Sequence, residues 1–251
     1  MRYPVNDILS MAISIGAHML KSGAEVWRVE DTVSRICAAY GCGASDVFSI
    51  TSVVVASVQH ESECVTQSRR IYSYVYNLKQ LEDLNALSRR ICKTTPAPKK
   101  VMEDMGDILE NARLKRVQKL FGYSIGVFSF TIFWGGTLKD ALASIIPALL
   151  LFAIDYFLNR GRINMLAYSL AASLIASLGA IGICALGFSD GLDKILIGNV
   201  MVLIPGIGLT NGIRDLLCGD IVSGLLRLWE AVLIAIAVAL GFALPIIITG
   251  G

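Results

Sequence analysis

Residues 166–187 read LAYSLAASLIASLGAIGICALG, an apolar stretch without a charged side chain. An α-helix rises about 1.5 Å per residue, so a helix of this length crosses the hydrocarbon core of a bilayer. Ala172, Ala176 and Ala180 are each four residues apart, and small side chains at this spacing let helices approach closely in lipid. We expect a membrane helix inside a bundle, packed within the chain or against another subunit.

Similar apolar segments occur on both sides of this stretch. The predicted spans are 118–136, 138–158, 163–187, 193–213 and 225–248. A soluble core does not supply five apolar segments of about 18 to 25 residues each. Residues 118–251 are therefore predicted to form a transmembrane domain of five helices.

Residues 1–117 carry most of the charged side chains. Apolar residues at helical spacing predict helices near 6–21, 22–40, 78–91 and 101–114, and β-branched runs predict short antiparallel strands within 46–70. Ser22 and Glu25 match the S-x-x-E capping box at the start of the second helix. The predicted fold is a membrane all-α bundle of five transmembrane helices preceded by a small α+β domain, with a helix connecting the two.

The basic residues indicate the orientation in the membrane. They cluster before the first span, between the second and third, and around the loop after the fourth, at Arg113, Lys115, Arg116, Lys119, Arg160, Arg162, Arg214 and Arg227. The other side has only Lys139 and Lys194. The positive-inside rule predicts a multi-pass protein of the inner or plasma membrane, with a cytoplasmic N-terminal domain and an outside C-terminus.

The composition argues against several other classes of protein and of binding site. The net charge of +2 comes without a long basic face, so nucleic acid is not an expected partner. The six cysteines lie far apart with no CxxC or CxxH spacing, so neither a metal nor a cofactor is expected. The N-terminus has no small-residue cleavage site and does not resemble a signal peptide.

The helix predicted after Gly23 reads AEVWRVEDTVSR at 24–35. Its charged residues suit a solvated ion-paired face. A second interpretation is a domain or subunit contact made by Gly23, Glu25, Arg28 and Glu30. A hydrolase using Glu25, Glu30 or His60 is a third, but no nucleophile motif supports it, so an enzyme is not expected.

Residues 203–220 read LIPGIGLTNGIRDLLCGD, which places a Pro-Gly step inside the fourth apolar segment. Pro205 removes an amide, and Gly206 and Gly208 expose backbone near the bilayer middle. Either the helix is kinked but continuous, or it is broken near Ile204 and starts again at Gly206. The N-terminus of a second half-helix would carry partial positive charge suited to a carboxylate.

Polar residues around this step are the predicted substrate pathway. Asn199 and Asn211 would line it, with Arg214, Asp215 and Asp220 at its cytoplasmic mouth. Arg227 and Glu230 lie three residues apart at the start of the fifth span. Either they form an ion pair at the interface, or they contact the substrate, Arg227 through a second carboxylate and Glu230 through an ammonium group. Asp155 would pair with Arg160 or Arg162.

Three stretches together resemble the threonine/serine exporter family. They are SGAEVWRVEDTVSRICAAYG at 22–41, NLKQLEDLNALSRRI at 77–91 and NVMVLIPGIGLTNGIRDLLCGDIVSGLLRLWEA at 199–231. The resemblance implies a secondary exporter of small polar metabolites, threonine and serine or a dicarboxylate such as succinate. It also implies a second five-span region, here a separate small membrane subunit, which makes this chain the large subunit of a two-component exporter.

The residues leave several alternatives open. Both substrate classes carry a carboxylate, so the same site serves either. A homo-oligomer is the simpler assembly from the sequence alone. The alternative function is a membrane-anchored, metabolite-sensing or regulatory protein whose soluble domain carries the activity, although an anchor needs only one or two uninterrupted spans.

Overall fold

The computed structural model describes residues 3–60, 63–72, 74, 76–112, 116–158 and 164–249. The chain divides into two compact units, each built from two separate segments. The first unit comprises Met1–Arg113 and Ile207–Trp229, and the second comprises Leu114–Gly206 and Glu230–Gly251. Residues 207–229 thus group with the N-terminal segment, whereas hydropathy assigns every residue after 117 to the membrane domain.

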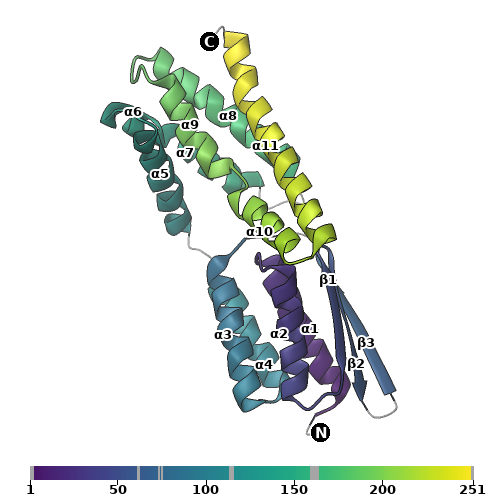
Figure 1. Ribbon diagram of the computed structural model, residues 1–251. Helices are drawn as coiled ribbons and strands as arrows, with labels where there is room; N and C mark the ends of the chain where they lie inside the picture. The colour runs from purple at the N-terminus through teal and green to yellow at the C-terminus, as the bar shows by residue number, and fades with distance from the viewer. Residues whose placement is uncertain are drawn as a thin grey trace. The chain divides into compact units, whose positions relative to one another are not determined.

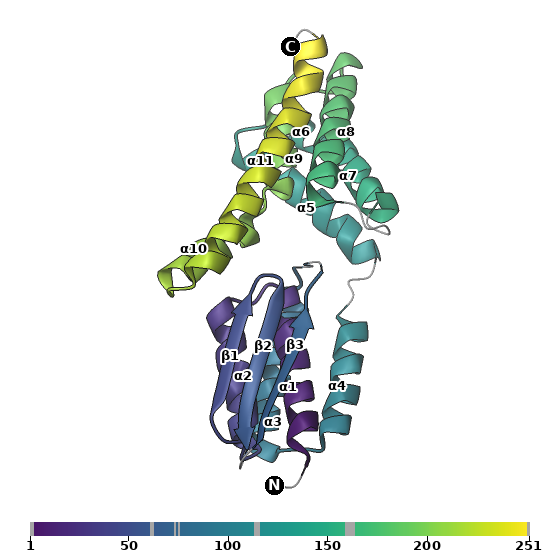
Figure 2. The ribbon, with the colours of Figure 1, turned by 90° about the vertical axis from the view of Figure 1, so that its right-hand side faces the viewer.

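The N-terminal segment of the first unit is a small α+β fold (Figure 1). Its elements are α1 (Val5–Lys21), α2 (Val26–Ala39), β1 (Ser45–Ile50), β2 (Val53–His60), β3 (Glu63–Arg70), α3 (Leu78–Thr94) and α4 (Pro98–Asn111). The strands form one antiparallel sheet in the order β1-β2-β3. The helices α1 and α2 pack against one face of this sheet, α3 packs on both of them, and α4 packs on α1 and α3. Figure 2 looks onto the other face of the sheet.

The core of this fold is formed by alternate residues of a strand and by helically spaced residues of α1. The alternate residues Val54, Ala56 and Val58 of β2 are fully buried, because successive side chains of a strand point to opposite faces. The helical stripe of α1 that includes Ile15 and Met19 is fully buried as well. The predicted α+β fold of the N-terminal region is confirmed.

The predicted capping box is wrong. Ser22 is the C-cap residue of α1, and its Oγ donates a hydrogen bond to the carbonyl oxygen of His18 at 2.7 Å. The helix α2 begins at Val26 with Glu25 as its N-cap residue, and it has no side-chain capping hydrogen bond. The carboxylate of Glu25 contacts two arginines instead.

The predicted helical connection between the domains ends earlier than expected. Pro98 starts α4 at a position where a missing amide hydrogen costs nothing. The helix ends at Asn111, and α5 begins at Arg116. Residues 113–115, on which the rest of that prediction falls, lie outside the described residues.

The second unit consists of helices. They are α5 (Arg116–Phe133), α6 (Leu138–Ala143), α7 (Ile145–Leu158), α8 (Met165–Ala185), α9 (Leu192–Leu203) and the larger part of α11 (Ile221–Thr249). Among the described residues, Leu138–Phe157, Met165–Ala185 and Ile221–Thr249 are long and apolar enough to cross a membrane. The bent pair of α9 and α10 (Gly206–Leu217) makes a fourth span if it is counted as one. The described chain has three or four candidate spans, and the predicted count of five stays a prediction.

The helix α5, predicted as the first span, is not among these candidate spans. It has 18 residues, and its first turn carries Arg116 and Lys119. Lys119 Nζ lies 3.0 Å from Asp155 Oδ2. Asp155 therefore has an ion pair with a partner that the sequence did not predict, while Arg160 and Arg162 lie outside the described residues.

The small residues of α8 pack inside the second unit, as their spacing predicts. Ala172, Ala176 and Ala180 are fully buried. A Cβ atom at Gly241 of α11 would lie 1.9 Å from Ser173 Oγ and 2.8 Å from the carbonyl oxygen of Leu170. The helices α8 and α11 thus approach so closely that only glycine fits at position 241.

The predicted interruption of the fourth apolar segment is present. The helix α9 ends at Leu203, and its C-cap residue Ile204 has an extended backbone with φ −61° and ψ 113°. Pro205 follows, and α10 begins at Gly206. The segment is therefore broken rather than only kinked, because a proline cannot continue the hydrogen-bond ladder of α9.

Candidate functional site

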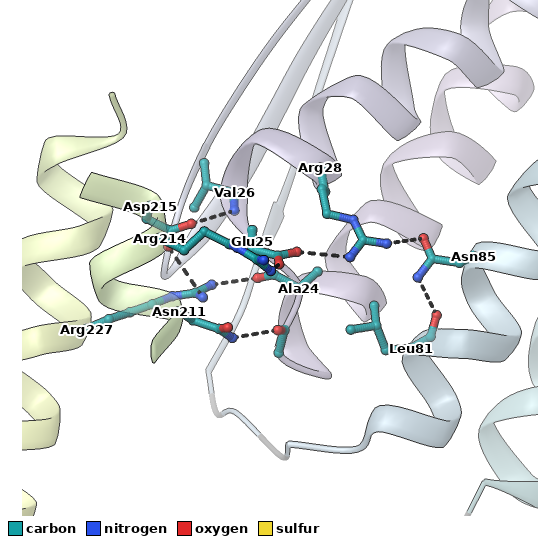
Figure 3. A network of polar contacts seen from close by, with 11 residues as sticks. Ala24, Glu25, Val26, Arg28, Leu81, Asn85, Asn211, Arg214, Asp215 and Arg227 are labelled. Atoms are coloured by element: carbon teal, nitrogen blue, oxygen red, sulfur yellow. Dashed lines mark hydrogen bonds and ion pairs between the residues drawn. The ribbon is translucent and has the colours of Figure 1, made fainter. Parts of the chain in front are cut away.

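The candidate site is formed where the turn between α1 and α2 meets α10 and the start of α11, all within the first unit (Figure 3). We call residues 22–26 the docking turn. Gly23 adopts φ +101°, and a Cβ atom there would lie 2.7 Å from Cδ1 of Tyr76. Both the backbone conformation and the close contact require glycine at this position.

Backbone groups of the docking turn receive side chains from α10 and α11. Asn211 Nδ2 donates to the carbonyl oxygen of Gly23 at 2.8 Å. Arg227 Nη2 donates to the carbonyl oxygen of Ala24 at 2.8 Å, and the amide of Val26 donates to Asp215 Oδ1 at 3.2 Å. These groups lie near the end of α1 and the start of α2, where helices leave backbone donors and acceptors without intrahelical partners.

Asp215 and Arg227 form a buried ion pair behind these contacts. Arg227 Nη1 lies 3.4 Å from Asp215 Oδ2, and the two side chains are 4% and 0% exposed. Neither of these two atoms makes a hydrogen bond with another described residue. Removing one partner of such a pair is strongly destabilising, because the other charge stays buried without compensation.

Glycines bring α10 and α11 close enough for this pair. Gly219 makes the turn between the helices with φ +98°. A Cβ atom at Gly224 would lie 2.8 Å from the carbonyl oxygen of Gly212. This close crossing sets Asp215 of α10 opposite Arg227 of α11.

Glu25 connects α10 to the helices α2 and α3 of the N-terminal fold. Its Oε1 lies 2.5 Å from Arg214 Nη1 and its Oε2 lies 3.2 Å from Arg28 Nη1. Arg28 in turn donates to Asn85 Oδ1 at 3.3 Å, and Asn85 donates to the carbonyl oxygen of Leu81 at 2.8 Å. Figure 3 shows this chain of contacts reaching from α10 to α3.

Glu25 is an ionised carboxylate at neutral pH. Burial by itself raises its pKa, but the hydrogen bonds from its own backbone amide and from Arg214, together with the charge of Arg28, outweigh burial and lower the pKa. A carboxyl with a lowered pKa in the folded state stabilises that state above its ordinary pKa, and this contribution is lost as the pH falls through the lowered value. The contact with Arg214 is therefore present at neutral pH.

Asp220 and Glu30 lie beside this network. Asp220 follows α10, and burial raises its pKa against the opposing effects of the Trp27 amide and the charge of Arg227. Glu30 Oε1 accepts hydrogen bonds from the amide and the hydroxyl of Ser49 in β1, and burial raises its pKa as well. Glu30 thus contacts β1 of the sheet.

Three other predicted pathway residues take no part in the hydrogen bonds and ion pairs described above. Asn199 is fully buried in α9 of the second unit, and its Oδ1 makes no hydrogen bond with another described residue. Glu230 is exposed and belongs to the second unit, whereas its predicted partner Arg227 pairs with Asp215. Gly208 lies on α10, where a Cβ atom would come within 3.0 Å of the Tyr76 hydroxyl.

The structure joins two residue sets that the sequence treats separately. Gly23, Glu25 and Arg28 are predicted as a domain contact, and Asn211, Arg214, Asp215 and Arg227 as members of a substrate pathway. Sequence reasoning missed the backbone groups of Ala24 and Val26, which carry no side-chain signal. It also missed Asn85, whose only signal is an amide side chain within the amphipathic helix α3.

The charged side chains of this site suit it to bind ionic groups rather than to carry out a reaction. It presents guanidinium groups and carboxylates, which bind complementary ions by charge-assisted hydrogen bonds. Within the part of the chain that the structure describes, no group of three or more His, Cys, Asp or Glu side chains is placed to hold a metal ion.

Comparison with known proteins gives a match along nearly the whole chain. The family described as "Putative threonine/serine exporter" matches residues 10–248. The "Probable threonine/serine exporter" of Mycobacterium tuberculosis (strain ATCC 25618 / H37Rv) is 22% identical over 246 residues. The alignment covers 95% of this chain and 46% of that protein, so the chain spans about half the length of this relative. No solved structure matches the chain.

Proposed function

This chain belongs to the threonine/serine exporter family, and from this premise we propose that it is one half of a secondary exporter of small metabolites that carry a carboxylate. The family is one of transporters rather than enzymes. The proposed substrates are threonine and serine or a dicarboxylate such as succinate. An ion gradient is the proposed driving force, because the sequence contains no nucleotide-binding motif.

The observation that supports a carboxylate substrate is the position of Arg214. Its side chain is 60% exposed, and its guanidinium holds a carboxylate, that of Glu25, at 2.5 Å. A guanidinium is always charged, and its planar donors match a carboxylate. We propose that Arg214 receives the substrate carboxylate at the cytoplasmic mouth and that Asn211, on the same helix, contributes a polar contact.

The rest of the pathway belongs to the same proposal. The break at Pro205 and Gly206 and the buried amide of Asn199 would continue it, since polar groups at membrane depth mark substrate paths. The proposed topology has five spans, a cytoplasmic N-terminal domain and an outside C-terminus. We propose that a second five-span half, on a separate membrane subunit, completes the exporter; the alignment covers 46% of the relative, which is thus long enough to hold a second half.

Counterflow into proteoliposomes tests the proposal, with the second half co-expressed and with labelled threonine and labelled succinate as alternative substrates. We expect uptake of one of the two. Arg214→Ala is expected to reduce its rate at low substrate by roughly 10- to 100-fold, the equivalent of about 1.5–3 kcal/mol for a hydrogen bond to a charged group. Asn211→Ala is expected to have a smaller effect in the same direction.

Arg90→Ala is the matched control, because Arg90 forms an ion pair with Asp104 between α3 and α4, away from α10. Its counterflow should equal that of the wild type. Unchanged export in both Arg214→Ala and Asn211→Ala, at normal abundance, would move the site elsewhere. Indifference of the wild type to both labelled substrates would remove the substrate assignment and favour a sensing role for the N-terminal domain.

A further inference from the structure

We propose that Glu25 is a built-in competitor of the exported substrate: its carboxylate occupies the carboxylate position on Arg214 and must be displaced before the substrate can bind. This inference rests on the proposed function of Arg214. It adds a regulatory role for the N-terminal domain, which neither the family match nor the pathway explains.

The chemical identity of the two groups carries the first step. Every proposed substrate presents a carboxylate, and Glu25 presents the same group to Arg214 at 2.5 Å. Glu25 is buried with 6% of its side chain exposed, whereas Arg214 is 60% exposed. A molecule arriving from solvent therefore reaches the guanidinium, but it meets a site in which one carboxylate is already bound.

The second step is that Glu25 has another partner. Its Oε2 lies 3.2 Å from Arg28, which Asn85 holds from α3. If a substrate displaces Glu25 from Arg214, the carboxylate keeps its contact with Arg28 and does not become a buried charge without a partner. On displacement, Arg214 exchanges its hydrogen bond with the Glu25 carboxylate for one with the substrate carboxylate. Because neither carboxylate loses all its partners, the displacement is reversible.

The third step is the tether. Asn211, Asp215 and Arg227 hold the backbone of the docking turn, so Glu25 stays beside Arg214 even when its carboxylate has moved away. A tethered group competes at an effective concentration set by the geometry of its tether rather than by its concentration in solution. Export is therefore expected to start only when the cytoplasmic substrate is concentrated enough to displace the Glu25 carboxylate from Arg214.

Two variants test the competition in the complete exporter, by counterflow as a function of the transported substrate. Glu25→Gln removes the charge and keeps the shape, and it should lower the half-saturating concentration about 10-fold while the maximal rate stays the same. Gly23→Ala displaces the docking turn without changing a charge, because of its φ of +101° and the contact with Tyr76. It should shift the half-saturating concentration in the same direction.

Asp104→Asn is the control, since it removes a carboxylate that pairs with Arg90 in the same fold. It should leave the half-saturating concentration unchanged. If Glu25→Gln and Gly23→Ala instead lower the maximal rate at normal abundance, the docking turn transmits motion and does not compete. An unchanged half-saturating concentration in both variants overturns the inference while the proposed function stands.

A binding measurement separates the two proposals. Threonine and succinate are titrated onto the purified, co-expressed complex, and its thermal stabilisation is followed. Tighter binding to Glu25→Gln than to the wild type supports the competition between Glu25 and the substrate. If no counterflow occurs in the same proteins, that result contradicts only the proposed export. Equal binding to both proteins contradicts the competition, and no binding to either contradicts both proposals.

Discussion

Arg227→Met is expected to destabilise the docked state of α10 and α11 by about 3–5 kcal/mol, the usual effect of breaking a buried ion pair. The substitution leaves Asp215 fully buried, with the amide of Val26 as its remaining hydrogen-bond donor among the described residues. It also removes the hydrogen bond to the carbonyl oxygen of Ala24. The first loss falls on the contact between α10 and α11, and the second on the contact between α11 and the docking turn.

The double variant Arg227→Met/Asp215→Leu is expected to regain most of this stability. Replacing both members of a buried ion pair by apolar residues is often neutral or stabilising, because no charge then has to be buried. Transport should not recover with it, since the proposed mouth of the pathway would have lost two polar groups. Thermal unfolding of the purified complex measures the stability, and counterflow measures the transport.

An exposed pair provides the control for this experiment. Arg35 and Asp31 lie 2.8 Å apart, and their side chains are 72% and 44% exposed. Arg35→Met should change the stability by less than about 1 kcal/mol, because water screens surface ion pairs. If Arg227→Met were as mild as Arg35→Met, the Asp215–Arg227 contact would not hold the docking turn.

Gly241→Ala is expected to disrupt the packing of α8 against α11 in the second unit. The new Cβ atom would lie 1.9 Å from Ser173 Oγ and 2.8 Å from the carbonyl oxygen of Leu170, and the backbone oxygen cannot move without moving the helix. Overpacking of this kind costs typically about 1–3 kcal/mol. The amount of folded protein recovered from membranes and its melting temperature measure the effect.

The chain offers a matched control and a partial rescue for this variant. Gly182→Ala, on α8, places its Cβ where no atom lies within 4 Å, so it should be tolerated. Adding Ser173→Gly to Gly241→Ala removes the side-chain contact but leaves the contact with Leu170. It should restore part of the stability. Equal tolerance of Gly241→Ala and Gly182→Ala would contradict this close approach of α8 and α11.

Periodicity made much of the fold predictable from the sequence. The β-branched runs within 46–70 indicated short antiparallel strands, and the structure forms β1, β2 and β3 there. Pro205 predicted an interruption before α10, either a kink or a break, because a missing amide disrupts a helix in any tertiary context. The capping box failed because Ser22 ends α1: its amide and its hydroxyl donate to carbonyl oxygens of that helix and do not face α2.

The candidate site was predictable as residues but not as an arrangement. Charges within apolar sequence single out Asp215 and Arg227, since burying a charge is costly unless it is paired. The pairing itself depends on a close helix crossing at Gly212 and Gly224. The interaction of Arg227 with Asp215 could not be read from spacing, which favoured Glu230 three residues away.

By itself the sequence determined the apolar segments, the α+β region, an interruption of the fourth apolar segment and the family, because each depends on local composition or on residue order along the chain. Only the tertiary structure decided that the docking turn receives α10 and α11. The hydrogen bonds involved join residues 188 to 203 positions apart. Most of their acceptors and donors in the turn are backbone groups, which every residue type shares and which therefore leave no signal in the sequence.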